Sequence, residues 1–431
     1  MAGELTPNGY RKRLVERRLD TLLRSFGCVE LTGPKWCGKT WTALSRAASV
    51  TKLDRLADRE AALVDPSLAL LGETPHLVDE WQEVPAVWDA ARRFVDDSGS
   101  KRGLLLLTGS TALRSDQRAK VHHSGAGRIA RLKMYPLSLA ESGDSTGEVS
   151  LERLFREEDF KPARRETSIE EVALWCCRGG WPANLELNDE AALETARQYL
   201  QAVLDANVID EGRSPAIALA ALQALALNAS RAVTYKTLIN DMSHGEGSRA
   251  VSEETLVSYL EMFDRFYLTE ELPGWEPPLR SKARVRVKPK RYFVDPSLAA
   301  SLVGATPERL LRDMQTLGDL FENLVLRDLR VYLSTYGMLD DRLSYYRDDK
   351  GLEVDAIIEH AGRWGAVEIK LSDTKADEAA ANLVRLRDKV LKNAAARNSE
   401  PAFLAVVVGR GALAYRRPDG VHVIPIATLA P

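Results

Sequence analysis

One glycine-rich stretch near the amino terminus has the residues and the spacing of a phosphate-binding turn. It matches the pattern GxxxxGK[ST] completely, through Gly33, Pro34, Lys35, Trp36, Cys37, Gly38, Lys39 and Thr40. The turn follows an apolar stretch and opens a helical one, which is the context that the pattern requires. Main-chain N–H groups can then point at phosphates, Lys39 can reach the β- and γ-phosphates, and the Thr40 hydroxyl can ligate Mg²⁺. The turn therefore predicts a site for ATP or ADP with Mg²⁺; the alternative is a strand–helix turn that binds nothing.

Two adjacent acids predict the hydrolytic half of this site. The apolar pair Leu77-Val78 is followed by Asp79 and Glu80. Asp79 would lie at the carboxyl edge of a sheet, where it can hold the metal through water. Glu80 could polarise the attacking water, which favours hydrolysis over phosphoryl transfer to a small alcohol and weighs against a metabolic kinase. The alternative for Glu80 is a solvated charge at the end of a strand.

A serine and an arginine are further candidates for contact with the nucleotide. A leucine run at 104–107 ends in Thr108-Gly109-Ser110, and the Ser110 hydroxyl could sense the γ-phosphate or position water. Arg128 could stabilise charge as an arginine finger, in the same chain or from a neighbouring copy. The alternatives are an ordinary strand-end serine and an ordinary surface arginine.

Six cations recur at every second position of a later stretch and predict a contact with nucleic acid. They are Arg280, Lys282, Arg284, Arg286, Lys288 and Lys290. On a β-strand this period puts all six on one face, where like charges repel unless a polyanion or opposing carboxylates neutralise them. Such a basic ribbon would bind a nucleic-acid backbone, DNA being favoured, with strong salt dependence and little reading of bases. The alternative is a solvated edge strand protected against aggregation.

The carboxyl-terminal part holds three acids and a lysine that suit metal-dependent hydrolysis of a phosphodiester. Asp355 lies on one expected strand, and Glu368 and Lys370 share a face of the next one. Neighbouring strands could present these three together, with Glu322 on the preceding helix completing a metal shell. The carboxylates would bind one or two Mg²⁺ ions, and the lysine would orient the nucleophile or steady the charge. The alternative is a half-exposed sheet with alternating charges.

The elements that must position these residues follow from the periodicity of the apolar residues. In the first third of the chain, short apolar stretches alternate with helix-length segments, which predicts a parallel sheet covered by helices. The expected strands are 28–32, 50–54, 76–78, 104–108 and 132–135, and the expected helices include 40–48 and 86–97. Residues 168–228 are rich in Ala and Leu and predict helices, which break at Gly179-Gly180-Trp181-Pro182.

Two further modules are expected after these helices. Helices at 234–241 and 253–263, followed by strands at 266–272 and 285–294, form a winged-helix pattern. From about residue 305 the order is helix, hairpin, strand, helix, strand, which is a small α/β module. Its hairpin strands are 343–347 and 352–358, and the next strand is 366–371.

The composition is that of an ordinary soluble globular protein. The chain has 431 residues and a formal net charge of -3, so affinity for nucleic acid must come from a local patch. Its four cysteines form no CxxC pair, which argues against a disulfide framework or a zinc cluster and fits a reducing cytosol. The longest apolar run, 216–229, is too short for a bilayer, and no signal-peptide pattern opens the chain. A cytoplasmic protein without a membrane partner is therefore expected.

Taken together, these residues resemble a known family of bacterial and archaeal AAA+-type ATPases with a C-terminal restriction-endonuclease-like domain of unknown function. The resemblance covers the chain from about Tyr10 to about Lys389. It rests on these stretches: 31–40, Asp79-Glu80-Trp81-Gln82, 107–110, Gly127-Arg128, Pro136-Leu137-Ser138, 179–182, Tyr259-Leu260, 289–295 and 368–370. Two departures, Trp36-Cys37 within the turn and Trp81, remove no phosphate or metal ligand but could alter the fit of the nucleotide.

The resemblance implies an α/β multidomain fold. Its parts would be a P-loop ATPase core with an AAA+-like parallel sheet over 1–165, a helical lid over 166–210, a winged helix over 211–304 and a PD-(D/E)xK-like module over 305–431. It carries the nuclease-type positions over to Glu322, Asp355, Glu368 and Lys370.

The expected activity is that of a cytosolic, Mg²⁺-dependent ATPase whose nucleotide state controls a DNA-contacting winged helix and a nuclease-like module. Glu80 would be catalytic in the first, and Asp355, Glu368 and Lys370 in the second. The alternative from another class is a nucleotide-switched regulator that binds DNA or protein and whose nuclease fold is catalytically inactive. A homo-oligomer would be needed if the arginine finger comes from a neighbouring copy.

Overall fold

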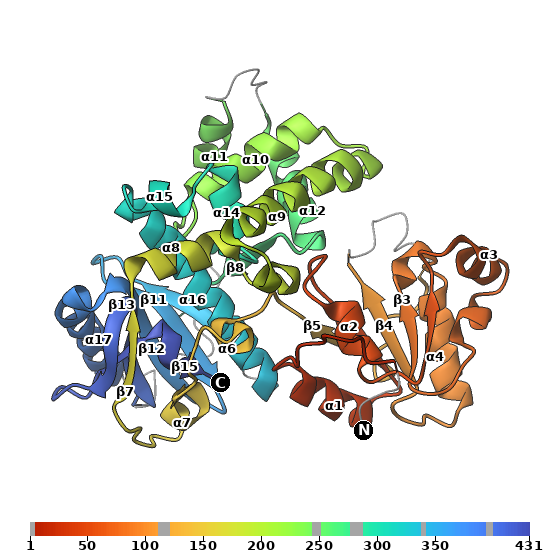
Figure 1. Cartoon of the computed structure of the whole chain (residues 1–431), viewed down its shortest axis with the longest axis horizontal. Coiled ribbons are helices and arrows are strands. Elements are labelled where there is room, and N and C mark those ends of the chain that lie inside the picture. The colour runs from red at the N-terminus through yellow and green to blue at the C-terminus, as the bar shows by residue number, and fades with distance from the viewer. Residues whose placement is uncertain (1–4, 111–120, 244–250, 276–287, 338–341, 394–399) are drawn as a thin grey trace. The chain divides into compact units, whose positions relative to one another are not determined.

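A computed structural model describes residues 5–110, 121–243, 251–275, 288–337, 342–393 and 400–431 (Figure 1). The chain divides into two compact units. Unit 1 comprises Met1–Pro136 and Met262–Leu268, and unit 2 comprises Leu137–Glu261 and Thr269–Pro431. In the described part of the chain, no helix is both long and apolar enough to cross a membrane.

Unit 1 is built on a parallel sheet of five strands in the spatial order β2-β3-β4-β1-β5 (Figure 1). The strands are β1 (Cys28–Thr32), β2 (Ser49–Lys52), β3 (His76–Asp79), β4 (Leu105–Gly109) and β5 (Ile129–Lys133). The helical segments are α1 (Glu16–Ser25), α2 (Lys39–Leu44), α3 (Leu56–Val64), η1 (Pro66–Leu70), η2 (Trp81–Glu83) and α4 (Val87–Asp97). The expected parallel sheet is thus confirmed, although α2 ends earlier and β5 begins earlier than the sequence predicts.

Both faces of this sheet are covered by apolar side chains, as the alternation along its strands requires. On β4, Leu106 joins a buried cluster with Leu19 and Leu22 of α1. Its neighbours Leu105 and Leu107 join a second cluster with the apolar side of α4. Successive strand residues point to opposite faces, so these leucines anchor helices on both sides. The carboxyl ends of β1, β3 and β4 are therefore held at one rigid edge.

Unit 2 contains a six-stranded mixed sheet in the order β10-β11-β12-β13-β14, with β7 paired to β13. Its strands are β7 (Ala163–Thr167), β10 (Arg342–Arg347), β11 (Glu353–His360), β12 (Arg363–Ser372), β13 (Phe403–Arg416) and β14 (His422–Pro425). One side of the sheet packs on α17 (Ala376–Leu391), whose Ala380, Leu383 and Leu386 are buried in the same cluster as Val406 of β13. The expected hairpin, strand, helix and strand of this module are all present.

A helical part lies between β7 and β10 in the chain. It contains α8 (Ile169–Arg178), η3 (Pro182–Glu186), α9 (Asp189–Ala202), η4 (Val203–Val208), α10 (Pro215–Leu227), α11 (Tyr235–Met242), α12 (Glu253–Arg265), α14 (Pro296–Leu302), α15 (Pro307–Leu310) and α16 (Met314–Tyr336). Small elements are α6 (Leu139–Ser142), α7 (Leu151–Phe155), η5 (Asp373–Lys375), η7 (Ile426–Thr428) and the strand pair β6 (Val149–Ser150) with β15 (Leu429–Ala430). After α10 to α12 comes an antiparallel pair, β8 (Thr269–Leu272) and β9 (Lys290–Phe293). This order agrees with the winged-helix pattern, which stays a prediction.

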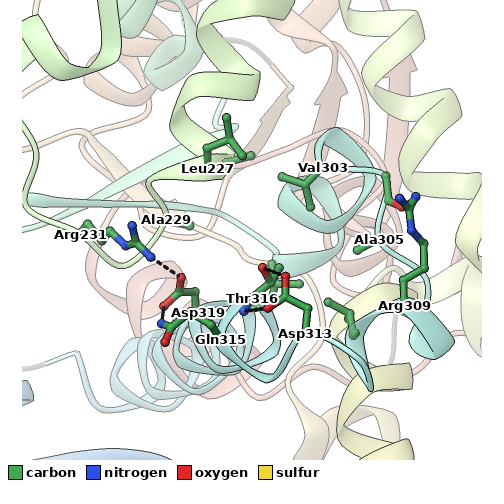
Figure 2. A pocket seen from close by; sticks show the side chains of 14 residues that line it. Leu227, Ala229, Arg231, Val303, Ala305, Arg309, Asp313, Gln315, Thr316 and Asp319 are labelled. Atoms are coloured by element: carbon green, nitrogen blue, oxygen red, sulfur yellow. Dashed lines mark hydrogen bonds and ion pairs between the residues drawn. The ribbon is translucent and has the colours of Figure 1, made fainter. Parts of the chain in front are cut away.

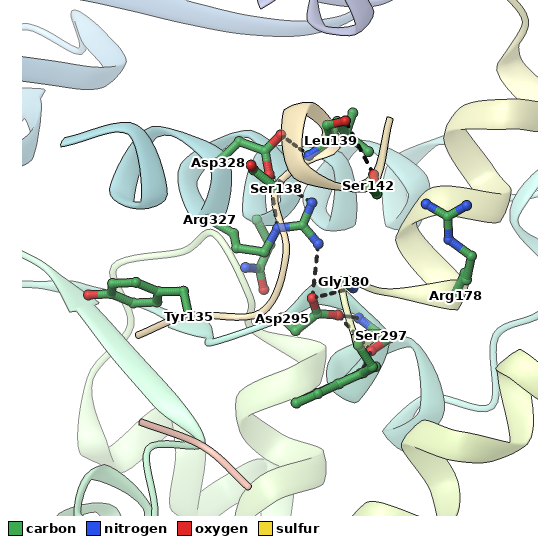
Figure 3. Close-up of polar contacts among 12 residues, drawn as sticks. Tyr135, Ser138, Leu139, Ser142, Arg178, Gly180, Asp295, Ser297, Arg327 and Asp328 are labelled. Carbon is green, nitrogen blue, oxygen red and sulfur yellow. Dashed lines mark hydrogen bonds and ion pairs between the residues drawn. The ribbon is translucent and has the colours of Figure 1, made fainter. Parts of the chain in front are cut away.

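A buried ionic network joins four distant segments of unit 2 (Figure 3). Arg327 of α16 donates through Nη1 to Asp295 Oδ2 at 2.9 Å and through Nη2 to Asp328 Oδ1 at 2.7 Å. Asp295 Oδ2 also accepts from the N–H of Gly180, and Asp328 Oδ2 accepts from the N–H of Leu139. Two stretches that carry the family resemblance, 179–182 and 289–295, therefore meet here, because each supplies a partner to a charge that would otherwise be buried alone.

Candidate functional site

The glycine-rich turn of residues 33–40, called the P-loop below, follows β1 and runs into α2. It therefore lies at the carboxyl ends of the strands of the unit 1 sheet. Gly33 has φ +141°, and a side chain there would come within 2.3 Å of the carbonyl oxygen of Met134. Gly38 has φ +97° and precedes the first residue of α2. Both positions favour glycine, the first because there is no room and both because φ is positive. The sequence pattern thus has the local structure that it predicts.

Lys39 lies inside the loop that it is expected to serve. Its side chain is buried, and Nζ donates to the carbonyl oxygens of Gly33 and Pro34 at 2.9 and 2.7 Å. These neutral acceptors hold the ammonium group at the loop without neutralising its charge. An entering phosphate could replace them with charged oxygens, which are stronger acceptors.

Three side chains meet beside Lys39 at the ends of α2, β3 and β4. The Thr40 hydroxyl donates to Asp79 Oδ1 at 2.9 Å, and the Thr108 hydroxyl donates to the same oxygen. Asp79 lies opposite Thr108 in the register of β3 and β4. Burial raises the pKa of Asp79, and the hydrogen bonds from the two hydroxyls act against this. A threonine hydroxyl beside a carboxylate is a donor set that fits Mg²⁺.

Glu80 follows in a left-handed conformation, with φ 54° and ψ 46°. This conformation costs about 1–3 kcal/mol for a residue with a side chain, and such residues concentrate at functional sites. Glu80 Oε2 accepts from Ser110 Oγ at 3.1 Å and from Gln82 Nε2. The structure therefore brings Glu80 and Ser110 together. Gln82 is not among the predicted site residues, because its only sequence signal is its place two residues after Glu80.

Arg13 supports the P-loop from a position that the sequence analysis did not identify. Its side chain is buried, and it donates to the carbonyl oxygens of Cys37 at 2.6 Å and Tyr135 at 2.8 Å. It thereby ties the turn to the chain after β5. The cluster of Arg11, Lys12 and Arg13 has the pattern of a solvated basic surface, and no sequence signal indicates that one of the three points inward.

Arg128 lies at the opposite edge of the sheet from the P-loop, which corrects the prediction that it contacts the nucleotide in its own chain. In the parallel register of β1 and β5, Cys28 pairs with Ile129 and Thr32 with Lys133. Arg128 thus precedes the first paired residue, whereas the P-loop follows the last. Its guanidinium binds Asp96 at 2.8 Å.

A second group of predicted residues comes together in unit 2. Lys370 Nζ lies 3.2 Å from Asp355 Oδ2 and 2.5 Å from Glu368 Oε2, and the N–H of Ile369 donates to Asp355 Oδ2 at 2.8 Å. This follows from the antiparallel pairing of β11 and β12, in which Ala356 lies opposite Val367. One residue further along, Asp355 lies opposite Glu368.

The two acids have opposite electrostatic surroundings. Burial, reinforced by the charge of Asp355, raises the pKa of Glu368 to about 8. Burial also acts to raise the pKa of Asp355, but the ammonium groups of Lys370 and Lys290 outweigh it, so this pKa is lowered. Glu368 Oε1 is buried and has no hydrogen-bond partner in the described part of the chain. An orphaned carboxylate oxygen beside an ionised aspartate fits a hard divalent cation.

Glu322 is not arranged as the third metal ligand that the sequence predicts. Its Oε1 accepts from the Tyr292 hydroxyl at 2.5 Å and from Lys290 Nζ at 3.2 Å. Burial and then the charge of Asp355 raise the pKa of Glu322 to about 7. Within the described ranges, no three His, Cys, Asp or Glu side chains are placed to hold a metal ion. In the described residues Glu322 is therefore not placed with Asp355 and Glu368 as a shell of three carboxylate ligands.

The predicted basic ribbon is only partly described. Arg280, Lys282, Arg284 and Arg286 lie outside the described residues. Lys288 is exposed, as expected, but Lys290 is buried and also lies 2.7 Å from Glu353 Oε1. Lys290 therefore belongs to the cluster of Glu322, Asp355, Glu368 and Lys370, called the acidic cluster below. It does not belong to a solvent-facing row, because opposing carboxylates neutralise its charge.

Unit 2 also has a cavity of about 420 Å³ between α10, α14, α15 and α16 (Figure 2). Its polar side chains pair with local groups: Arg231 lies 3.5 Å from Asp319, and Arg309 donates to the carbonyl oxygen of Gly304 at 2.6 Å. Asp313 accepts from Thr316. Because these polar side chains already have hydrogen-bond or ion-pair partners, the cavity offers a weaker case for a ligand than the P-loop or the acidic cluster.

Comparison with protein families gives matches to three parts of the chain. Residues 25–143 match an AAA domain, residues 169–309 match a domain of unknown function (DUF8612), and residues 317–429 match another (DUF4143). No match is found among curated proteins.

The solved structures that are similar to the chain include two of low identity. A Walker-type ATPase of Pyrococcus abyssi has 15% identity and a TM-score of 0.45, with 70% of this chain and 99% of that one covered. The ORC2 protein of Aeropyrum pernix, in ADPNP and ADP complexes, has 12% identity and a TM-score of 0.32, with 75% and 98% covered. The match of residues 25–143, together with the P-loop geometry, supports an ATP-binding domain of the AAA type.

Proposed function

We propose that the chain binds ATP together with Mg²⁺ at its P-loop and hydrolyses it. The observation that carries this proposal is the arrangement of Lys39, Thr40 and Asp79 at one edge of the sheet, with the Thr40 hydroxyl 2.9 Å from Asp79 Oδ1. These are the charge, the hydroxyl and the carboxylate that a magnesium-bound triphosphate requires.

Each residue would have a separate role. Lys39 would exchange the carbonyls of Gly33 and Pro34 for oxygens of the β- and γ-phosphates. Thr40 and Asp79 would hold the Mg²⁺ that arrives with the nucleotide and neutralises phosphate charge. Glu80 would accept a proton from the attacking water, and its hydrogen bond from Ser110 at 3.1 Å keeps the carboxylate in place.

The test compares nucleotide binding and turnover in two variants. Lys39→Ala should lose both. Glu80→Gln should keep binding and lose about 10²–10⁴ of the hydrolysis rate, the usual contribution of a general base. Glu83→Gln is a matched control, because Glu83 lies three residues along the chain with 44% of its side chain exposed. Hydrolysis by Glu80→Gln at the wild-type rate would remove Glu80 from this role.

A second function, hydrolysis of a phosphodiester, is favoured by the cluster of Asp355, Glu368 and Lys370. The two carboxylates would hold a divalent cation, which when bound supplies Lewis acidity and an activated water. Lys370 Nζ lies within 3.2 Å of both acids. Lys370 would shield the two carboxylates from solvent and would present its ammonium group to the substrate phosphate.

A nicking assay separates this function from its alternative, a nucleotide-switched regulator with an inactive nuclease fold. Supercoiled plasmid with Mg²⁺ or Mn²⁺ should be nicked or linearised by the wild type but not by Glu368→Ala or Lys370→Ala. Glu378→Gln, with 73% of the side chain exposed on α17, is the control. If every DNA and RNA form stays intact with or without ATP, the regulator is the better description.

Contact with nucleic acid, DNA being favoured, is also part of the proposal. It rests on the period-two cations of the basic ribbon, of which Lys288 is exposed in the structure. Arg284→Glu with Arg286→Glu should flatten the salt dependence of DNA binding, since fewer counterions would be released. An unchanged slope would favour edge protection instead.

The setting that we propose is a reducing cytosol, because Cys28, Cys37, Cys176 and Cys177 are all free and buried. If Arg128 serves as an arginine finger, it would act on a neighbouring copy of the chain, because it lies at the far end of the strands from the P-loop of its own chain.

A further inference from the structure

The acidic site of unit 2 is completed by a strand that lies outside the sheet carrying its acids. Asp355 lies on β11 and Glu368 on β12, whereas Lys290 and Tyr292 lie on β9, in the hairpin with β8. A carboxyl-terminal module cut just before α16 would therefore lack both of these residues.

Lys290 is fixed by every group around its ammonium. Only 3% of the side chain is exposed, and Nζ lies 2.7 Å from Glu353 Oε1 and 3.2 Å from Glu322 Oε1. It also lies 5.2 Å from the centre of the Tyr345 ring, a distance at which the ring face attracts a cation. A lysine held in this way acts as a resident positive charge and does not reach out to a ligand.

The same contacts hold one oxygen of Glu322 in place. Its Oε1 already accepts from Lys290 and, at 2.5 Å, from the Tyr292 hydroxyl. Glu368 is in the opposite situation, since its Oε1 is buried without a partner in the described part of unit 2. Glu368 is therefore the acid of this cluster whose buried oxygen most needs a cation, and Asp355 lies opposite it on the paired strands β11 and β12.

The charges of the cluster lead to the same conclusion. The three most buried acids, Asp355, Glu368 and Glu322, face the ammonium groups of Lys370 and Lys290, which leaves a formal charge of -1 when all are ionised. Glu353 is balanced separately, because it is 35% exposed and also lies 3.7 Å from Arg347. One divalent cation would turn this charge to +1, which a phosphodiester would neutralise; a second cation would leave a large uncompensated excess.

We propose that Lys290 is a positioning residue that holds Glu322 and thereby limits the acidic site to a single divalent cation, bound by Asp355 and Glu368. The cation is of the hard, oxygen-preferring class, such as Mg²⁺ or Mn²⁺. This inference rests on the proposed phosphodiester hydrolysis for its biological sense, but its test needs no cleavage.

The first experiment titrates Mn²⁺ into the full-length chain without nucleotide and counts bound ions by electron paramagnetic resonance. The wild type should bind one ion that Glu368→Gln loses or binds at least about tenfold more weakly. Glu322→Gln should retain this ion with an affinity within a few-fold of the wild type. Equal weakening by Glu322→Gln and Glu368→Gln would make Glu322 a ligand and overturn the proposal.

The second experiment removes the resident charge. Lys290→Met should bind two Mn²⁺ ions at this site, because Glu322 becomes available, and Lys290→Met with Glu322→Gln should return to one. Lys290→Arg should stay at one ion. If Lys290 had a purely structural role, the variants would differ in melting temperature, but Lys290→Met would not bind one ion more than the wild type, the double variant and Lys290→Arg. A folded Lys290→Met protein that still binds one ion would overturn the proposal.

If Lys290→Met does not fold, the doubly substituted protein, in which the buried pair is replaced by two neutral side chains, and the comparison of Glu322→Gln with Glu368→Gln still decide. Absence of any Glu368-dependent ion would remove both this inference and the proposed nuclease chemistry. A single Glu368-dependent ion in a protein that cleaves no nucleic acid would remove the nuclease chemistry alone.

Discussion

The hydroxyl of Thr40 and the carboxylate of Asp79 are joined by a hydrogen bond of 2.9 Å between Oγ1 and Oδ1. Thr40 follows the P-loop lysine, Lys39. Asp79 ends β3, which is separated by one strand, β4, from β1, the strand that leads into the P-loop. The bond holds both metal-binding groups at the position where a magnesium ion would enter, so little rearrangement is needed when the nucleotide arrives.

Thr40→Val should therefore weaken nucleotide binding only when Mg²⁺ is present. Valine has nearly the shape of threonine but removes the hydroxyl ligand, so ATP affinity in Mg²⁺ should fall by about tenfold or more, the equivalent of ~1.4 kcal/mol. Calorimetry in Mg²⁺ and in EDTA measures the difference. A matched control is Thr108→Val, which removes the other donor to Asp79 but no expected metal ligand. An equal loss of affinity in EDTA would show that Thr40 acts through the fold.

Arg13→Met should loosen the P-loop without touching the nucleotide. It removes charge-assisted hydrogen bonds to the carbonyls of Cys37 and Tyr135, which are typically worth about 1.5–3 kcal/mol each. We expect a lower melting temperature and a higher KM for ATP. Lys12→Met is the control, since Lys12 is exposed next to it in the sequence. An unchanged KM in a stable Arg13→Met protein would contradict a supporting role.

Arg128→Ala should leave the ATP hydrolysis rate of the dilute protein within about twofold of the wild-type rate, because Arg128 lies at the opposite end of the strands from the P-loop. The rate should be measured over a range of protein concentrations. A large loss that appears only at high concentration would identify a finger supplied between copies, whereas a large loss at every concentration would contradict the position in the structure.

Breaking the buried ionic network around Arg327 should lower the free energy of unfolding of unit 2. Arg327→Met leaves Asp295 and Asp328 without their cation, and removal of one partner from such a buried pair costs about 3–5 kcal/mol. Chemical denaturation measures the cost. Arg347→Met is a control with 54% of the side chain exposed. A loss below about 1 kcal/mol, the usual value for an exposed pair, would mean that water reaches the network.

The stability of the metal-free protein should fall as the pH rises through about 8. The pKa values of Glu322 and Glu368 are raised in the folded state to about 7 and about 8. Between their ordinary values near ~4.3 and these raised values the folded state binds more protons than the unfolded state, so stability is greatest at the acidic end of this range. Melting temperatures from pH 5.5 to 8.5, all in EDTA, give the slope.

Glu368→Gln should flatten this slope, because glutamine has no proton to lose, while the exposed Glu378→Gln should leave it unchanged. An equal slope in the wild type and in Glu368→Gln would contradict the raised pKa of Glu368, since the lowered pKa of His422 affects both proteins alike.

The arrangement of the P-loop could be predicted almost completely from the sequence. Its strand, turn and helix are adjacent in the chain, and Asp79, Glu80 and Ser110 each follow an apolar strand whose end must reach the same sheet edge. Asp355, Glu368 and Lys370 could be placed together for a similar reason, since two neighbouring strands of period two put them on one face.

The remaining corrections concern contacts that period and spacing do not contain. The register of β5 decides which edge Arg128 occupies, and this depends on where Ile129 begins to pair. Lys290 has the spacing of the basic ribbon, but Glu322 and Glu353, which are distant in sequence, bind it inside the cluster. Arg13 is separated from Cys37 by 24 positions and donates to a main-chain carbonyl, which no sequence pattern marks.

The indole of Trp36 is 55% exposed within the P-loop, at a residue with φ 64°. Because the ring is part of the turn that phosphates would enter, its fluorescence should change in intensity when a nucleotide arrives. The protein thus carries its own optical reporter, and stopped-flow mixing of unlabelled ATP could follow arrival and departure separately from hydrolysis.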